Sequence, residues 1–143
     1  MRALKILILS VLINIFYFPL KIKNMYAKEY QKNVYSQELE KCTDGTGYYR
    51  NGYCKTGNDD VGTHVVCAEV TEDFLNYTKS QGNDLSTPTS YFPGLKPGDR
   101  WCLCGYRFEQ ARKAGFAPKV YLEGTHSKAL EFTSIEDLKK YSI

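Results

Sequence analysis

The stretch that decides the fold is His64-Val-Val-Cys-Ala-Glu-Val70, together with the segment directly after it. Its β-branched residues predict a strand, with His64 at the strand's entrance. Thr71 then offers a side-chain oxygen to cap a helix from Glu72 to about Gln81, which has acidic residues in its first turn and Gly82 as its stop. We therefore expect a strand followed at once by a helix.

Further elements on both sides of this stretch predict a small sheet with helices. Asn51-Gly52 lies between two tyrosine-containing segments and predicts a β-hairpin, because Asn-Gly supplies the two positive-φ residues of a type I′ turn. Beyond a long Pro/Gly-rich loop over residues 83–99, the patterns predict strands over 100–104, 119–123 and 130–132, and helices over 106–114 and 135–141. Strands outnumber helices without regular alternation, so we expect a small two-layer α+β domain, with an antiparallel or mixed sheet and helices on one face.

The first 27 residues are interpreted as a hydrophobic leader in front of a single domain over residues 28–143. Residues 1–5 are short and basic and residues 6–20 carry no charge, which is typical of a signal peptide. The uncharged run is short for a membrane anchor, which usually needs about 20 apolar residues. A third interpretation makes Met25 the true start. We expect an exported or membrane-anchored protein if the leader is translated, and a cytoplasmic one if Met25 is the start.

The charge of the domain argues against nucleic acid as a partner. Four of the 19 lysines and arginines lie in the leader, which contains none of the 16 acidic residues, so the domain itself is close to neutral. Its basic residues are scattered among acids instead of forming a stripe. Membrane contact is expected only through the N-terminal segment.

Five cysteines and two histidines are the main candidates for chemistry. If residues 102–104 form a strand, Cys102 and Cys104 lie on the same face about 7 Å apart, because alternate residues of a strand point the same way. His64 and Cys67 lie three residues apart at the entrance of the other strand. Thiolates and imidazoles are the usual ligands of zinc. The spacing therefore predicts a zinc site of Cys67, Cys102, Cys104 and His64, with an approach lined by Asp99, Arg100 and Trp101.

The cysteines also have two structural interpretations. Free cysteine is among the most buried residue types, so all five can simply fill the core. If the leader exports the domain, disulfides are expected instead, and the odd number of cysteines leaves one thiol unpaired. Cys42 with Cys54, across the predicted hairpin, is the first pairing to consider.

A catalytic interpretation uses the same residue types. A nucleophilic cysteine needs a nearby base, which a histidine can supply once the fold brings the two together. The candidates are Cys67, Cys102, Cys104, His64 and His126. The loop Gly57-Asn-Asp-Asp60 lacks the spacing of a calcium-binding loop, so we interpret it as a solvated turn.

Several segments share a pattern with a known family. They are Gly47-Tyr-Tyr-Arg-Asn-Gly-Tyr-Cys54, Asp60-Val-Gly-Thr-His-Val-Val-Cys-Ala68, Gly82-Asn-Asp-Leu-Ser-Thr-Pro88 and Phe92-Pro-Gly-Leu-Lys-Pro-Gly-Asp-Arg-Trp-Cys-Leu-Cys104. In these segments, and from about Lys32 to its end, the chain resembles the domain-of-unknown-function 2237 family. The resemblance implies a compact two-layer α+β domain of bacterial type, usually without a leader, and it implies no established activity. The N-terminal extension departs from the family pattern, which favours the start at Met25.

Three hypotheses for function follow. The first is a small metal-binding or thiol-dependent protein that uses the Cys/His cluster. The second is a non-catalytic interaction module, in which the loop Ser86–Asp99 contacts a protein partner through exposed aromatic residues such as Tyr91 and Phe92, and the cysteines only pack or form disulfides. The third is an enzyme with a cysteine nucleophile and a histidine base.

Overall fold

The computed structural model describes residues 31–143, together with Leu20 and Ile22. The chain divides into two units, Met1–Tyr30 and Gln31–Ile143, and the fold described here is that of the second. The predicted leader lies outside the described residues. None of the helices in the described part of the chain is long and apolar enough to cross a membrane.

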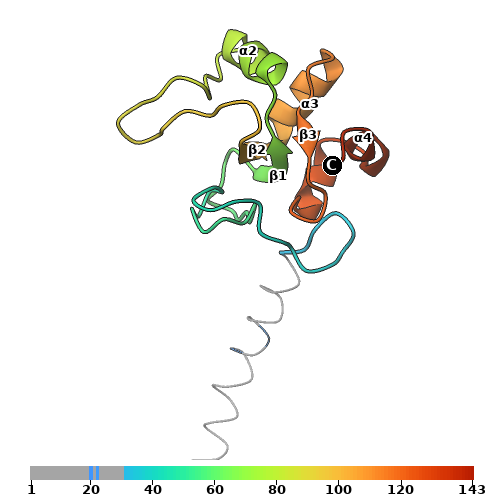
Figure 1. Ribbon diagram of the computed structural model, residues 1–143. Coiled ribbons are helices and arrows are strands. Elements are labelled where there is room, and N and C mark those ends of the chain that lie inside the picture. The colour runs from blue at the N-terminus through green and yellow to red at the C-terminus, as the bar shows by residue number, and fades with distance from the viewer. Residues whose placement is uncertain (1–19, 21, 23–30) are drawn as a thin grey trace, which may run out of the picture. The chain divides into compact units, whose positions relative to one another are not determined.

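A three-stranded antiparallel sheet lies at the centre of the domain (Figure 1). The central strand β1 (His64–Glu69) pairs with β2 (Arg100–Cys104) on one side and with β3 (Lys119–Val120) on the other. In the first pair Cys67 lies opposite Cys102, and an irregularity of register next to His64 bends the start of β1. The expected α+β fold with an antiparallel sheet is confirmed.

Three α-helices and one 3-10 helix complete the domain: α2 (Glu72–Ser80), α3 (Gly105–Lys113), η1 (Ser127–Glu131) and α4 (Ile135–Lys140). The predicted caps are present, since Thr71 accepts a hydrogen bond from the amide of Phe74 and Ser134 accepts one from the amide of Asp137. The α-helices bury one apolar cluster together with one face of the sheet. Its largest fully buried members are Phe74, Phe108, Leu103 and Leu138.

A second, smaller cluster lies on the opposite face of β1, because neighbouring residues of a strand point to opposite sides. There Cys67 packs with three other cysteines, while its neighbour Ala68 belongs to the helix-side cluster. Two of the partner cysteines, Cys42 and Cys54, come from the irregular segment before β1, so that segment covers the face of the sheet that the helices leave open.

The predicted hairpin around Asn51-Gly52 is wrong, since the segment forms turns and bends instead of two paired strands. Positive φ angles fall on Arg50 (55°) and Gly52 (90°) and not on Asn51, so the type I′ turn is not made. The flanking residue Cys54 is bonded to Cys102 of the sheet. The disulfide to the sheet therefore holds this segment in position, and local strand pairing does not.

Two other predicted strands also differ from the structure. The strand predicted over residues 119–123 is confirmed only for Lys119–Val120, because a turn closed by the amide of Thr125 and the carbonyl of Leu122 begins directly afterwards. The strand predicted over residues 130–132 is wrong. Residues 127–131 form η1, which begins where the ring of His126 accepts a hydrogen bond from the amide of Lys128.

Candidate functional site

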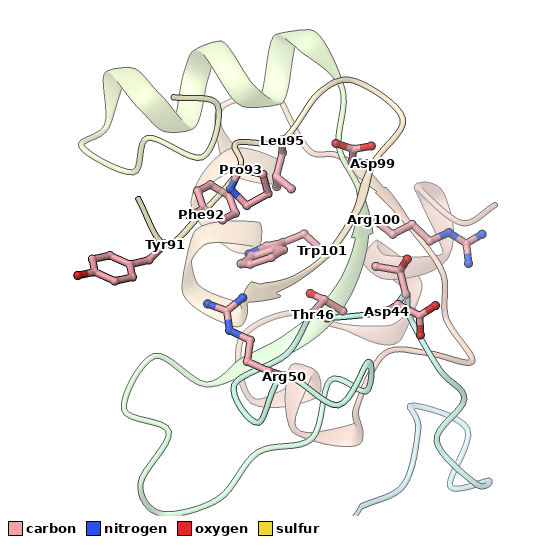
Figure 2. Close-up of a pocket in the computed structure, with 12 residues that line it drawn as sticks. Asp44, Thr46, Arg50, Tyr91, Phe92, Pro93, Leu95, Asp99, Arg100 and Trp101 are labelled. Atoms are coloured by element: carbon pink, nitrogen blue, oxygen red, sulfur yellow. The ribbon is translucent and has the colours of Figure 1, made fainter. Parts of the chain in front are cut away.

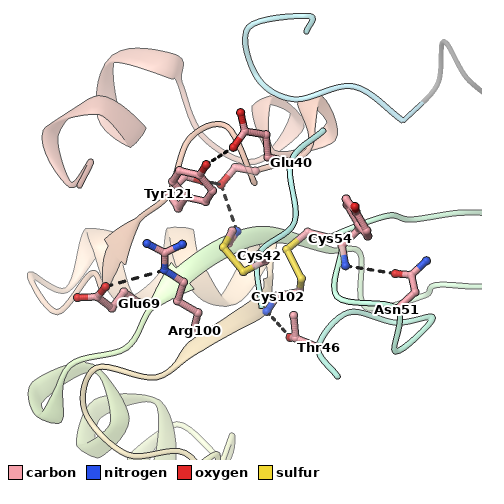
Figure 3. The surroundings of a disulfide bond; sticks show 12 residues. Glu40, Cys42, Thr46, Asn51, Cys54, Glu69, Arg100, Cys102 and Tyr121 are labelled. Carbon is pink, nitrogen blue, oxygen red and sulfur yellow. Dashed lines mark hydrogen bonds and ion pairs between the residues drawn. A yellow bond between two sulfur atoms is a disulfide. The ribbon is translucent and has the colours of Figure 1, made fainter. Parts of the chain in front are cut away.

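Four of the five cysteines form two disulfides, Cys42–Cys67 and Cys54–Cys102 (Figure 3). The predicted pairing of Cys42 with Cys54 is therefore wrong. The register of the sheet explains the outcome, because Cys67 and Cys102 lie opposite each other on β1 and β2 and each reaches a different cysteine of the covering segment. All four residues are buried, at 0–4% exposure.

The two disulfides make a compact sulfur cluster. The sulfur atoms of Cys42, Cys54 and Cys102 all lie within 4.8 Å of one another. The cluster is flanked by Tyr121, and the amide of Cys102 donates to the hydroxyl of Thr46 at 2.9 Å (Figure 3). The cluster thus joins the covering segment to the sheet.

The fold divides the four residues of the predicted zinc site into two groups. Cys67 and Cys102 belong to the sulfur cluster, where both are disulfide-bonded. Cys104 is the one free cysteine among the described residues, and it lies opposite His64 in the pairing of β1 with β2. Zinc is bound by thiolates, so the disulfide-bonded form does not offer these four residues as a ligand set. The zinc site predicted from spacing stays a prediction.

Cys104, His64 and Asp60 form a continuous chain of side chains. His64 lies opposite Cys104 in the pairing of β1 with β2, an interaction with the Cys104 side chain raises the pKa of its ring, and its Nδ1 lies 2.6 Å from Oδ1 of Asp60. Because Asp60 occupies Nδ1, Nε2 is the ring nitrogen that remains for the sulfur. The order cysteine, histidine, carboxylate is that of a nucleophile, a base and an orienting group.

Asp60 is the most deeply buried member of this chain, with a side chain that is 0% exposed. Its carboxylate accepts hydrogen bonds from the Thr56 hydroxyl at 2.9 Å and from the His64 amide at 2.8 Å, in addition to the contact with the ring. Burial alone would raise the pKa of Asp60, but these hydrogen bonds hold it below its usual value. Asp60 is therefore ionised at neutral pH and holds the ring in one orientation.

The pKa of His64 is raised from 6.5 to about 9. The hydrogen bond with Cys104 is the largest cause; partial burial opposes it, and the hydrogen bond with Asp60 adds to the rise. The negative charge of Asp60 also favours the protonated ring. At neutral pH the ring is therefore an imidazolium ion.

The loop before β1 is shaped to hold this ring. Thr63 has a positive φ of 49°, a conformation that β-branched residues rarely adopt, directly before His64. A Cβ atom at Gly62 would lie 2.6 Å from Cε1 of His64, so only glycine lets the ring pack against the loop. The ring of Tyr48 stacks on the imidazole with centroids 6.2 Å apart. Strained backbone of this kind is found most often at functional sites.

Cys104 stands at the junction of β2 and α3, as the residue that precedes the first turn of the helix. The next residue is Gly105, where an added Cβ atom would lie 2.4 Å from the ring of Phe132. The start of α3 is thus packed closely against the end of η1, which fixes the position of the thiol. A helix N-terminus also favours a negative charge placed there.

The remaining candidate residues have other positions. His126 is buried, and its ring caps η1 by accepting from the amide of Lys128 at 3.0 Å. Asp99, Arg100 and Trp101 line a pocket of about 620 Å³ that does not include Cys104 among its lining residues (Figure 2). Tyr91 is 97% exposed on the loop that borders this pocket, so the predicted contact with a protein partner stays a prediction.

Sequence reasoning missed Asp60. The loop over residues 57–60 was expected to be a solvated turn, whereas the side chain of Asp60 is fully buried against His64. The available signal was the spacing of four residues between the carboxylate and the imidazole, together with Gly62 and Thr63 between them. Spacing alone does not reveal that the loop folds back onto the ring.

Comparison with family models matches residues 32–142 to the family described as "Uncharacterized protein conserved in bacteria (DUF2237)". The match covers nearly all of the described residues and confirms the resemblance seen in the sequence segments. Comparison with curated proteins finds no match. The description of the family names no activity.

Proposed function

The chain belongs to the DUF2237 family, whose description assigns no activity, and from this premise we propose that it is a thiol-dependent protein with Cys104 as its reactive group. The single observation that carries the proposal is the chain of contacts from Cys104 through His64 to the buried carboxylate of Asp60. The other four cysteines of the described residues are bonded in the two disulfides and offer no free thiol.

The chemistry follows from the roles of the three groups. The thiolate, and not the thiol, is the nucleophile, so a positively charged partner that stabilises the thiolate activates the sulfur. The His64 ring is protonated at neutral pH and is oriented by Asp60, so its Nε2–H offers that positive charge to the sulfur when the thiol proton passes to solvent. The thiolate of Cys104 then attacks an electrophilic atom of a substrate. At a carbonyl carbon the new S–C bond forms as the C=O π bond opens to an oxyanion; at a disulfide sulfur the new S–S bond forms as the old S–S bond breaks and the other sulfur leaves as a thiolate.

The test is the rate of alkylation by iodoacetamide at pH 7 in the absence of reductant, when Cys104 is the free thiol. We expect native Cys104 to react faster than the same thiol in protein unfolded by urea, with both disulfides intact. His64→Gln should slow the reaction of the folded protein by about tenfold, because the sulfur loses its charged partner. The matched control Asp59→Asn, in the same loop but exposed, should leave the rate unchanged.

Two results would contradict the proposal. One is a native thiol that reacts no faster than the unfolded one. The other is an alkylation rate in His64→Gln equal to that of the unsubstituted protein, when dispersed amide signals in the NMR spectrum of the variant show that it is folded.

The sulfur cluster supports a second candidate function, metal binding by the reduced protein. Its four buried sulfurs lie on two strands and one covering segment, and three of them are already within 4.8 Å of one another. Reduction of both disulfides by a phosphine would yield four thiols, and Zn²⁺ bound by four thiolates would displace their four protons. The ligands would be Cys42, Cys54, Cys67 and Cys102.

Native mass spectrometry of the reduced protein with added zinc tests this candidate. We expect one zinc ion that is lost on denaturation, and we expect Cys104→Ser to retain it. Loss of zinc in Cys104→Ser would instead support the site predicted from spacing, which uses Cys104 and His64. A reduced protein that retains no zinc would eliminate both sites.

A further inference from the structure

The pocket beside Trp101 has walls from two distant parts of the chain (Figure 2). Thr43–Thr46 and Arg50 come from the segment before β1, and the other wall is the loop that leads into β2. The volume of about 620 Å³ lies within the usual range for small-ligand sites, roughly 300–1,000 Å³. It is therefore large enough to hold a small organic molecule.

The loop wall is held by its own hydrogen bonds. The amide of Thr89 donates to the carbonyl of Phe92 at 2.7 Å, and the amide of Leu95 donates to the carbonyl of Leu85 at 2.7 Å. The ring of Phe92 packs against Trp101 with centroids 5.2 Å apart. The pocket thus presents the packed rings of Phe92 and Trp101 on a hydrogen-bonded frame, with Tyr91 at its border.

Two of the four charged residues that line the pocket are paired with residues outside it. Asp44 forms an ion pair with Lys41. Arg100 lies 4.0 Å from Glu69 and its guanidinium is over the ring of Tyr121. Figure 2 shows its side chain directed away from Trp101. These two groups contribute little net charge to the pocket. The fourth charged residue, Asp99, accepts from the amide of Lys96, and Figure 2 shows it on the other side of Trp101 from Arg50.

Arg50 is different. Its guanidinium lies 5.1 Å from the centroid of the Trp101 ring, and Figure 2 shows it directed toward that ring. Among the described residues it has no acidic partner within ion-pair distance. Its backbone has a positive φ of 55°, which is uncommon for a residue other than glycine. The turn thus directs a cation without an acidic partner at an aromatic surface.

We propose that this pocket binds a small molecule that carries a flat ring and an anionic group, a carboxylate or a phosphate. The ring packs against Trp101 and Phe92, and the anion pairs with the guanidinium of Arg50, whose planar donors match both kinds of anion. The proposal is independent of the thiol chemistry, because Cys104 does not line the pocket.

The chain contains one tryptophan, so the indole N–H gives a single signal in a ¹H–¹⁵N spectrum, and this signal reports on the pocket. The disulfide-bonded full chain is titrated with naphthalene-2-carboxylate, with 2-naphthyl phosphate and with the neutral naphthalene-2-carboxamide. We expect a saturable shift of the Trp101 signal with at least one of the anions, and at least tenfold weaker binding of the amide. The better of the two anions distinguishes a carboxylate ligand from a phosphate ligand.

Two variants test the role of Arg50. Arg50→Gln should weaken binding of the better anion about tenfold, and Arg50→Lys should restore part of it. Arg107→Gln is the matched control, because Arg107 also lies over an aromatic ring, that of Tyr106, but outside the pocket.

The proposal is overturned if neither anion gives a saturable shift below about 10 mM, which is weaker than a specific site of this size should bind. Equal affinity for the anions and the amide would also overturn it, as would unchanged binding in a folded Arg50→Gln protein. None of these outcomes depends on the reactivity of Cys104.

Discussion

Replacing Asp60 by asparagine tests the core of the candidate site with the smallest possible change of shape. One oxygen of the new amide can still accept from the Thr56 hydroxyl and from the His64 amide, as the carboxylate does. The NH₂ group then faces Nδ1 of His64, where Asp60 holds the ring at 2.6 Å. An amide NH₂ can bond only to an unprotonated Nδ1, so the substitution favours the neutral ring with its proton on Nε2.

The magnitude follows from the one contact that is lost. A hydrogen bond between charged groups contributes about 1.5–3 kcal/mol, and the His64 side chain is 31% exposed, so solvent screening favours the lower end. We expect Asp60→Asn to lower the free energy of unfolding at pH 6 by about 1.5 kcal/mol. The pKa of His64 should fall from about 9 toward 6.5, since Asp60 contributes to its rise.

Urea unfolding followed by tryptophan fluorescence measures the stability, and the ring-proton signals of the two histidines measure the pKa. Asp59→Asn is the matched control. It makes the same chemical change one residue earlier, at an exposed carboxylate that accepts from the hydroxyl of Tyr49, and should cost less than about 0.5 kcal/mol. The alkylation rate of Cys104 should fall in Asp60→Asn and not in the control, because a neutral ring no longer offers a positive charge to the thiolate.

Equal losses of stability in Asp60→Asn and Asp59→Asn would refute the reasoning. They would show that the buried carboxylate beside His64 contributes no more to stability than an exposed carboxylate in the same loop. An unchanged pKa of His64 in Asp60→Asn would refute the assigned electrostatic role. A pKa that falls while the alkylation rate stays constant would separate the structural role of Asp60 from any role in activating the thiol.

Three further predictions concern the whole domain. The folded-state pKa of His64 is raised, so the contribution of its protonated ring to stability is fully present below pH 6.5 and is lost as the pH rises through about 9. Urea unfolding at a series of pH values should show this decline in stability. The variant His64→Gln should lack it. Gly105→Ala should destabilise the domain by about 1–3 kcal/mol in the same assay, because the new Cβ meets the ring of Phe132, and the added substitution Phe132→Ala should reduce the cost of that clash. Removal of the Cys54–Cys102 disulfide by a double serine substitution should lower the free energy of unfolding by about 4 kcal/mol, and removal of Cys42–Cys67 slightly less. The reason is that the first bridge closes the longer loop, with a sequence separation of 48 against 25. Midpoints of urea unfolding in the reverse order would contradict this ranking.

Local patterns predicted those elements whose signals lie within a few residues. The strand at His64, the helix capped by Thr71, the strand ending at Cys104 and the helix capped by Ser134 were all expected, and their caps are the ones that form. The hairpin at Asn51-Gly52 was expected on an equally local signal but does not form. The difference is that its segment is tied to the sheet by a disulfide, so a distant contact outweighs the preference of the turn.

The sequence alone also determined the chemistry that the domain can offer, since the five thiols and two imidazoles were the candidates from the start. Their partners were decided by tertiary structure. Cys102 and Cys104 lie on one strand, yet one is bonded to Cys54 and the other lies beside His64, because each meets a different part of the chain. The burial of Asp60 and the position of Arg50 over Trp101 likewise depend on loops packed against residues far away in the sequence. Propensity and spacing act over a few residues, whereas burial, pKa and disulfide pairing depend on neighbours that only the folded chain brings together.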